Sequence, residues 1–321
     1  MLLKPPAIFI MGPTASGKTD LAVALRAHLP VEIISVDSAQ IYKTMDIGSA
    51  KADPSVLEKH PHALIDIRDP SEAYNVGDFV KDARRQMKDI RARGNIPLLV
   101  GGTMMYFKLL FSGLSDLPGG DPVIRDNLLR RATQHGWESL YEELMRLDPE
   151  TARKLHPNHS QRIQRALEVI EITGKPLSVL QAKGVHKGVQ HDYRVESLAL
   201  ISGNRQLLHQ RIEERFRQMM ARGFLGEVRA LYERDDLSAD LPSLRTAGYR
   251  QLWQHLDGEF DIGEAVNRAI IASRQLAKKQ LTWLRKWPDA NQILIDDGEQ
   301  VLSCEKICKE SLKILSNHRI L

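Results

Sequence analysis

The chain has 321 residues, of which 42% are hydrophobic and 27% charged, a balance typical of a folded globular protein and not of a disordered one. No apolar run approaches the ~20 residues of a membrane helix, and Cys304 and Cys308 are too few for a disulfide framework, so we expect a cytoplasmic protein without membrane contact. The formal net charge of +4 favours a nucleic-acid partner only slightly.

A buried strand is expected at Ala7–Met11, and helical periodicity follows at Asp20–Leu29. Between them the chain has a phosphate-loop motif, GxxxxGK[ST], in the strand–loop–helix setting that such loops require. Its glycines let backbone N–H groups turn toward an anion, its lysine adds a positive charge, and its last residue offers an oxygen ligand for Mg²⁺. The motif predicts a diphosphate or triphosphate ligand without saying which, and its residues are Gly12, Pro13, Thr14, Ala15, Ser16, Gly17, Lys18 and Thr19.

Three further apolar runs predict strands that alternate with helices at Val76–Arg93 and Thr103–Phe111, which is typical of a parallel sheet with its ligand edge at the strand ends. The second strand leads into Asp37, and the fourth leads into Gly101-Gly102-Thr103 instead of the aspartate of a nucleotide hydrolase. Asp37 is therefore expected either near a metal or as a base on an incoming nucleophile. A helix-capping role stays open for both Asp37 and Thr103. The three strands are expected at Val31–Val36, His62–Ile67 and Ile96–Val100.

From Val123 to Thr173 the sequence predicts helices only, the last of them ending at Gly174, and a strand returns at Val195–Ile201. We therefore expect an α/β fold: a phosphate-loop core with a parallel sheet flanked by helices (residues 1–114 and 195–321), a helical insertion domain (115–194), and a helical C-terminal part. The helices of the insertion are expected at Val123–His135, Trp137–Arg146, Glu150–Leu155 and Ser160–Thr173.

Basic residues gather on three of the expected helices. On Ile262–Trp287 they form two rows beside an apolar stripe, an arrangement that suits a nucleic-acid backbone, although a solvated basic face is the simpler interpretation. Arg162 and Arg165 on Ser160–Thr173 invite the same two interpretations. Arg211 and Arg215 lie one turn apart on Arg205–Leu231 and suit a diphosphate or surface ion pairs equally. The rows are Arg274, Lys278 and Arg285, and Arg268, Lys279 and Lys286.

Six ordered motifs together resemble the bacterial tRNA dimethylallyltransferases, also called tRNA isopentenyltransferases. The resemblance runs from about Ala7 to Trp287, with small departures at Ser49, Ala52 and Asn75, and without the zinc finger of eukaryotic members. The motifs are the phosphate loop, Asp37-Ser38-Ala39-Gln40-Ile41-Tyr42, Met45–Lys51, Gly101–Phe107, Gln161–Glu168 and Arg274–Arg285.

The resemblance implies transfer of the dimethylallyl group of dimethylallyl diphosphate to the N6 amine of the adenosine 3′ of the anticodon in tRNA. Asp37 would be the base, Thr103 would donate a hydrogen bond to the bridging oxygen, and the loop with Lys18, Arg215 and a Mg²⁺ on Thr19 would hold the diphosphate. We expect a monomer without an obligate protein partner. Contacts with the anticodon stem-loop are implied for Asp37, Ser38, Ala39, Gln40, Thr103, Arg125, Gln161, Arg162, Ile163, Gln164, Arg165, Arg245, Thr246, Ala247, Gly248, Tyr249, Arg274, Lys278 and Arg285.

Two other functions use the same motifs. A small-molecule or nucleoside kinase also has a phosphate loop, and Asp37 and the arginines of 125–131 would then serve its substrate and lid, but the basic C-terminal helix stays unexplained. A nucleotide-switched RNA-binding protein leaves Asp37 and Thr103 without a task. The ordered motifs favour the prenyltransferase.

Overall fold

The structure is a computed structural model that describes residues 4–182 and 187–317. The chain divides into two compact units: the core unit, Met1–Phe111 with Val189–Leu321, and the insertion unit, Ser112–Gly188. Among the described residues, no helix combines the length and the apolar character needed to cross a bilayer.

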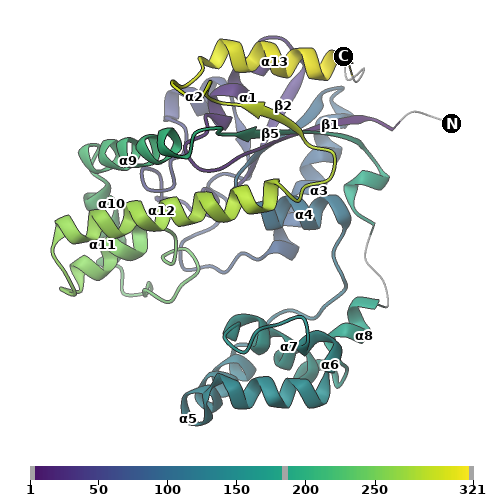
Figure 1. Ribbon diagram of the computed structural model, residues 1–321, viewed down its shortest axis with the longest axis vertical. Coiled ribbons are helices and arrows are strands. Elements are labelled where there is room, and N and C mark those ends of the chain that lie inside the picture. The colour runs from purple at the N-terminus through teal and green to yellow at the C-terminus, as the bar shows by residue number, and fades with distance from the viewer. Residues whose placement is uncertain (1–3, 183–186, 318–321) are drawn as a thin grey trace. The chain divides into compact units, whose positions relative to one another are not determined.

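The core unit contains a six-stranded parallel sheet in the order β3-β2-β4-β1-β5-β6. Figure 1 labels three of its strands, β1, β2 and β5. At the carboxyl edge, Gly101 at the end of β4 pairs with Met11 of β1 on one side and with Val36 of β2 on the other. The register therefore places the phosphate loop and the Asp37 turn on either side of the end of β4. The strands are β1 (Pro6–Met11), β2 (Val31–Val36), β3 (His62–Ala63), β4 (Ile96–Gly101), β5 (Arg194–Ile201) and β6 (Asn291–Leu294).

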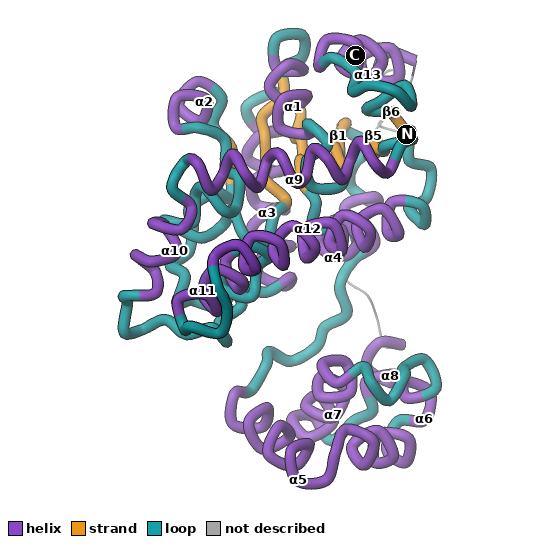
Figure 2. Tube along the Cα trace, turned by 60° about the vertical axis from the view of Figure 1, so that its left-hand side comes forward, coloured by secondary structure: helices purple, strands orange, loops and turns teal. Residues whose placement is uncertain are grey.

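Helices cover both faces of this sheet because its strands are apolar on both sides. Ile8 and Ile10 of β1 pack on the face covered by α1 (Lys18–Arg26) and α13 (Cys304–Asn317). Phe9 and Met11 belong to the core on the opposite face, where α3 (Val76–Ala92) and α4 (Met104–Ser112) pack. The helices between β5 and β6 pack on one another, with α9 beside α12 (Figure 2). They are α9 (Arg205–Ala221), α10 (Phe224–Tyr232), α11 (Tyr249–Leu256) and α12 (Ile262–Leu284), and the short α2 (Pro54–Lys59) lies between β2 and β3 in the chain.

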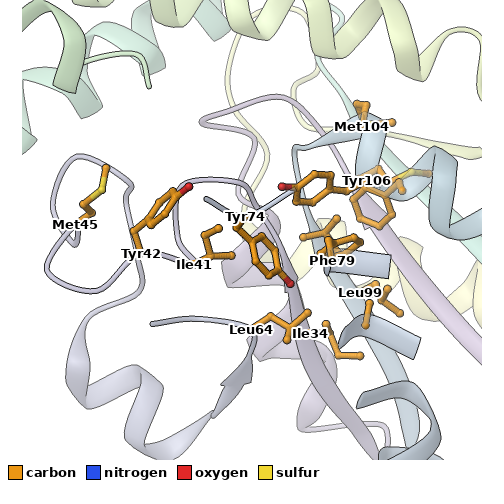
Figure 3. Close-up of a cluster of buried hydrophobic side chains, with 14 of the residues drawn as sticks. Ile34, Ile41, Tyr42, Met45, Leu64, Tyr74, Phe79, Leu99, Met104 and Tyr106 are labelled. Atoms are coloured by element: carbon orange, nitrogen blue, oxygen red, sulfur yellow. The ribbon is translucent and has the colours of Figure 1, made fainter. Parts of the chain in front are cut away.

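An aromatic cluster anchors the segment that follows the Asp37 turn (Figure 3). Tyr42 is almost fully buried, and the rings of Phe79 and Tyr106 stack with centroids 4.4 Å apart. The buried ammonium of Lys51 donates to Asp46 Oδ1 at 2.6 Å and to Asp66 Oδ1 at 2.5 Å. These contacts fix both ends of the loop 42–51, which lines the site described below.

The insertion unit contains only helices within its described residues. Its longest helix, α5 (Pro122–Leu147), is kinked at Gly136, and α7 (Ser160–Thr173) ends at Gly174 as expected. Leu128, Leu144 and Leu167 belong to its own small core. The unit spans 112–188 where 115–194 was expected, and it ends earlier because Val189 and Tyr193 are buried in the core unit. Its other elements are α6 (Pro149–Ala152) and α8 (Leu177–Ala182), and the 3-10 helix η1 (Val189–His191) follows it.

Candidate active site

The phosphate loop curls back on itself between β1 and α1. Gly17, the residue before α1, adopts φ 81°, a left-handed conformation that favours glycine. Lys18 Nζ donates to Pro13 O at 2.6 Å and lies 3.4 Å from Ser16 Oγ, so the lysine closes over the loop. The backbone thus has the shape that the motif predicts for binding an anion at a helix N-terminus.

Positive charge is concentrated around this loop. Burial, with a further contribution from Arg215, lowers the pKa of Lys18 to about 7, while Asp37 acts in the opposite direction. Burial also lowers the pKa of Arg215, whose Nη1 lies 3.4 Å from Thr14 Oγ1. Arg211, one turn earlier on α9, lies 3.9 Å from the point where a side chain on Gly17 would begin. Among the described residues, no carboxylate forms an ion pair with Lys18, Arg211 or Arg215. Such a group of unpaired cations favours binding of an anion.

Asp37 caps the turn after β2 and still keeps one oxygen available. Its Oδ1 accepts hydrogen bonds from Ala39 N at 2.9 Å and Gln40 N at 3.4 Å. Within the described part of the chain no group donates to its Oδ2. The structural role and the chemical role that the sequence left open are therefore compatible, because each uses a different oxygen.

Thr103 joins the end of β4 to the Asp37 turn, since its Oγ1 accepts from Ser38 N at 3.0 Å and lies 3.4 Å from Ser38 Oγ. The two strand ends approach closely at Gly101, where an added Cβ would lie 2.0 Å from Val36 O. Glycine is therefore required here for packing, which brings Thr103 and Asp37 together.

Gln280, which the sequence analysis missed, bridges the phosphate loop and the end of β4. Its Oε1 accepts from Thr14 N and its Nε2 donates to Gly102 O, each at 2.9 Å. The residue is 8% exposed and lies on α12 among apolar neighbours. The sequence did contain a signal for this role, which is a glutamine within the apolar stripe of a helix. A buried side-chain amide needs hydrogen-bond partners, so its position predicts a polar contact.

Glu227 on α10 is the second missed residue. Its carboxylate accepts from the backbone N–H groups of Asp46, Ile47 and Gly48 at 2.7–3.1 Å, and from Tyr249 Oη at 2.5 Å. Burial, together with Glu227, raises the pKa of Tyr249 far above its usual range. Tyr249 is fully buried in the structure, and the RNA contact implied for this residue stays a prediction.

A cavity of about 950 Å³ lies within the core unit beside the phosphate loop, Arg215 and Asp37. Thr19, Asp37 and Gln40 line it, with the loop 46–53 and the α9 side chains that face the phosphate loop. Phe216, Met219 and Leu276 give it an apolar part. Gln40 is engaged at both ends of its amide, with Ser35 Oγ at 3.0 Å and Ala50 O at 3.3 Å, and so shapes the wall. Ala39 is buried, which leaves it only backbone groups for binding.

The other core-unit residues that the resemblance implies as RNA contacts differ in burial and in their partners. Thr246 and Ala247 line the cavity, and Gly248 is buried beside Phe224. Arg245 is half-exposed and pairs with Asp240 at 3.3 Å. On α12, Arg274 pairs with Glu213 at 2.7 Å, whereas Lys278 and Arg285 are exposed.

In the insertion unit, a fully buried glutamate organises the expected RNA-binding arginines. Glu168 accepts from Arg125 Nε at 2.7 Å, Arg165 Nη1 at 2.6 Å and Asp121 N at 2.8 Å. Burial acts to raise the pKa of Glu168, but these hydrogen bonds hold it below its ordinary value. Gln164 donates to Arg125 O, and Gln161 and Arg162 are exposed. Ile163 is fully buried in the unit's core, and the RNA contact implied for it stays a prediction.

Comparison with known proteins shows the family of the chain. The family model described as IPP transferase matches residues 40–287. Three solved structures are similar over 98% of this chain. The full-length tRNA isopentenylpyrophosphate transferase of Bacillus halodurans is 33% identical with 97% of its chain covered (TM-score 0.67), and the tRNA delta(2)-isopentenylpyrophosphate transferase of Staphylococcus epidermidis is 32% identical with 100% covered (TM-score 0.68). A eukaryotic dimethylallyltransferase acting on tRNA is 26% identical with 80% covered (TM-score 0.79). The chain belongs to the IPP transferase family.

Proposed function

We propose that the chain transfers the dimethylallyl group of dimethylallyl diphosphate to the exocyclic N6 amine of the adenosine 3′-adjacent to the anticodon in tRNA, and releases diphosphate. As a member of its family the protein is a tRNA prenyltransferase. One observation carries the residue assignment: a single cavity contains both an unpaired group of cations and a carboxylate with a free oxygen.

The cations act on the leaving group. In the reaction the allylic C1–O bond breaks, the electron pair leaves with the diphosphate, and positive charge develops on carbon. Lys18, Arg215 and the N–H groups of the phosphate loop stabilise the departing anion, the kind of preorganised electrostatic contribution that dominates such sites. Thr103 donates a hydrogen bond to the bridging oxygen in this proposal. The apolar wall with Phe216 and Met219 accepts the prenyl group and excludes water.

Asp37 acts on the nucleophile. As the N6–C1 bond forms, the amine becomes acidic, and Oδ2 of Asp37 accepts its proton while Oδ1 stays bonded to the turn. A positioned base of this kind contributes typically about 10²–10⁴-fold. Ser38 lies beside it and is exposed, which suits a contact with the base edge of the adenine.

The donors present fit a Mg²⁺ ion. The Thr19 hydroxyl and the Asp37 carboxylate both line the cavity. Among the described residues no group of three or more His, Cys, Asp or Glu could hold a metal by itself. Mg²⁺ is commonly bound by few protein oxygens together with substrate phosphates, so Thr19 with the diphosphate is a suitable set. When bound, the ion would neutralise charge on the diphosphate.

For the RNA we propose a two-part contact with the anticodon stem-loop. Lys278 and Arg285 of α12 meet the phosphate backbone on the core unit, and Gln161 and Arg162 do so on the insertion unit. Arg125 and Arg165, which Glu168 holds, contribute the exposed parts of their side chains. We also propose that the reaction takes place in the cytoplasm.

Mass analysis of unmodified tRNA after incubation with the protein and dimethylallyl diphosphate tests the function. We expect a mass gain of one dimethylallyl group on one adenosine, and a loss of turnover by about 10²–10⁴-fold in Asp37→Asn, which keeps the shape and loses the basicity. RNA binding should persist in that variant. An unmodified tRNA together with phosphate transfer from ATP would instead identify a kinase.

A further inference from the structure

Trp283 on α12 is the most solvent-exposed tryptophan of the chain. Its side chain is 40% exposed, whereas Trp253 and Trp287 are 6% and 7% exposed and belong to the core. An exposed indole that neither fills a core nor caps a strand leaves a large flat apolar surface in water.

The neighbours of Trp283 on the helix are cations. Lys279 precedes it by four residues and Lys286 follows it by three, so both share its side of the helix. Both lysines are exposed, and within the described residues neither has an ion-pair partner. An aromatic ring between two unpaired ammonium groups suits a ligand that has both a flat base and a phosphate backbone.

Trp283 also lies on the side of α12 that faces the active-site cavity. Leu276 and Gln280 line that cavity, and Trp283 continues the same side at the i, i+4, i+7 spacing. Seven residues of helix advance about 10 Å, which equals roughly three nucleotides of a stacked strand. A strand whose reactive adenosine enters the cavity can thus bring a nearby base to this ring.

We propose that Trp283 stacks on an unpaired base of the RNA within about three nucleotides of the modified adenosine, with Lys279 and Lys286 contacting the adjoining phosphates. The inference rests on the proposed function. An adenine that leaves its stack to react deprives its neighbour of a stacking partner, and the indole replaces that partner. Trp283 is then a substrate-positioning residue outside the chemistry itself.

The test compares steady-state kinetics of Trp283→Ala and Trp283→Phe with the unchanged protein. For Trp283→Ala we expect a KM for tRNA raised about tenfold or more, with kcat at saturating tRNA and the KM for dimethylallyl diphosphate unchanged. Trp283→Phe should restore most of the affinity, because a phenyl ring also stacks. The matched control is Leu294→Ala on β6, which removes an apolar side chain that is 51% exposed and lies neither on α12 nor among the residues that line the cavity, so all three constants should stay unchanged.

Tryptophan fluorescence gives a second measurement, which would not change on RNA binding if Trp283 had only a structural role. Titration with an unmodified anticodon stem-loop should quench the emission of the unchanged protein, and Trp283→Phe should abolish that quenching. An unchanged KM for tRNA in Trp283→Ala would overturn the proposal, as would protein dimers that dissociate only in that variant. Failure of the proposed function is distinguishable, because then even the unchanged protein would transfer no prenyl group.

Discussion

Arginines occur in two opposite electrostatic situations in this molecule. At the phosphate loop, Arg211 and Arg215 lie near Lys18 with no ion-pair partner among the described residues, and burial together with the charge of Arg215 lowers the pKa of the lysine. In the insertion unit, Arg125 and Arg165 share the buried carboxylate of Glu168. Both groups look alike in a sequence, as basic residues on helices.

The presence or absence of a carboxylate partner distinguishes arginines that bind a ligand from arginines that stabilise the fold. Cations held near one another without a counter-ion cost free energy until an anionic ligand arrives, so the phosphate-loop group is built for a ligand. Cations already neutralised by a buried glutamate have their partner and hold the insertion unit's chain in place. A cluster of basic residues in the sequence therefore does not by itself identify an anion-binding site. The absence of a carboxylate partner in the structure is the better indication.

The largest effect that tests this distinction is expected at Arg215. Arg215→Ala should weaken binding of dimethylallyl diphosphate by roughly 10- to 100-fold, because a charge-assisted contact to the ligand is lost. Isothermal titration calorimetry measures it. Arg165→Ala is the matched control and should leave that affinity unchanged; equal losses in the two variants would erase the distinction.

Glu168→Gln tests the second group of arginines, which are paired with a buried carboxylate in the insertion unit. Loss of the charge leaves two arginines with weaker hydrogen bonds, and we expect the insertion unit to lose about 1–3 kcal/mol of stability, less than for a fully buried pair because the arginine heads are partly exposed. Hydrogen exchange of α5 and α7 reports this loss. Glu213 provides the control, because it accepts hydrogen bonds from two arginines, Arg217 and Arg274, at the protein surface. Glu213→Gln should change the hydrogen exchange of α9 little.

The smallest effect concerns the proton on Lys18. Its pKa is lowered to about 7 in the free protein, so above pH 7 the lysine is largely neutral and must take up a proton when a diphosphate binds. Affinity should therefore fall by up to about tenfold per pH unit above pH 7. The unfolded chain holds this proton up to the ordinary lysine pKa, so the same group makes the ligand-free fold more stable as pH rises from 7.

Calorimetry at pH 8 in buffers of different ionisation enthalpy measures the proton uptake directly. Lys18→Met removes the titrating group and should remove the uptake. A titration without uptake in the unchanged protein would mean that Lys18 keeps its proton and that the neighbouring cations do not depress its pKa.

Much of the core was predictable because its signals are local. The first, second and fourth strands and α3, α7 and α12 follow from short apolar periods and lie within a few residues of the expected bounds. The third strand is much shorter than the expected His62–Ile67, since Leu64 and Asp66 adopt left-handed backbone conformations that end it. The helix expected at Arg205–Leu231 breaks at Gly223 into α9 and α10. The strand β6 was missed because Ile293 is its only buried residue.

The candidate site was predictable in part for the same reason. The phosphate loop, Asp37 and Thr103 occur at strand ends, where a motif suffices to place them. Gln280 and Glu227 reach their partners across 266 and about 180 residues of chain, and no local pattern encodes such a contact. The buried positions of Ile163 and Tyr249 are likewise a result of tertiary packing, which a motif match does not contain.

The tight approach of Val36 to Gly101 has a consequence for how this enzyme can vary. A side chain at position 101 would collide with the backbone of Val36, directly before Asp37. Even alanine there would push apart the two strand ends that lead into the Asp37 turn and Thr103. We therefore expect position 101 to tolerate only glycine, whichever residues occupy the surrounding loops.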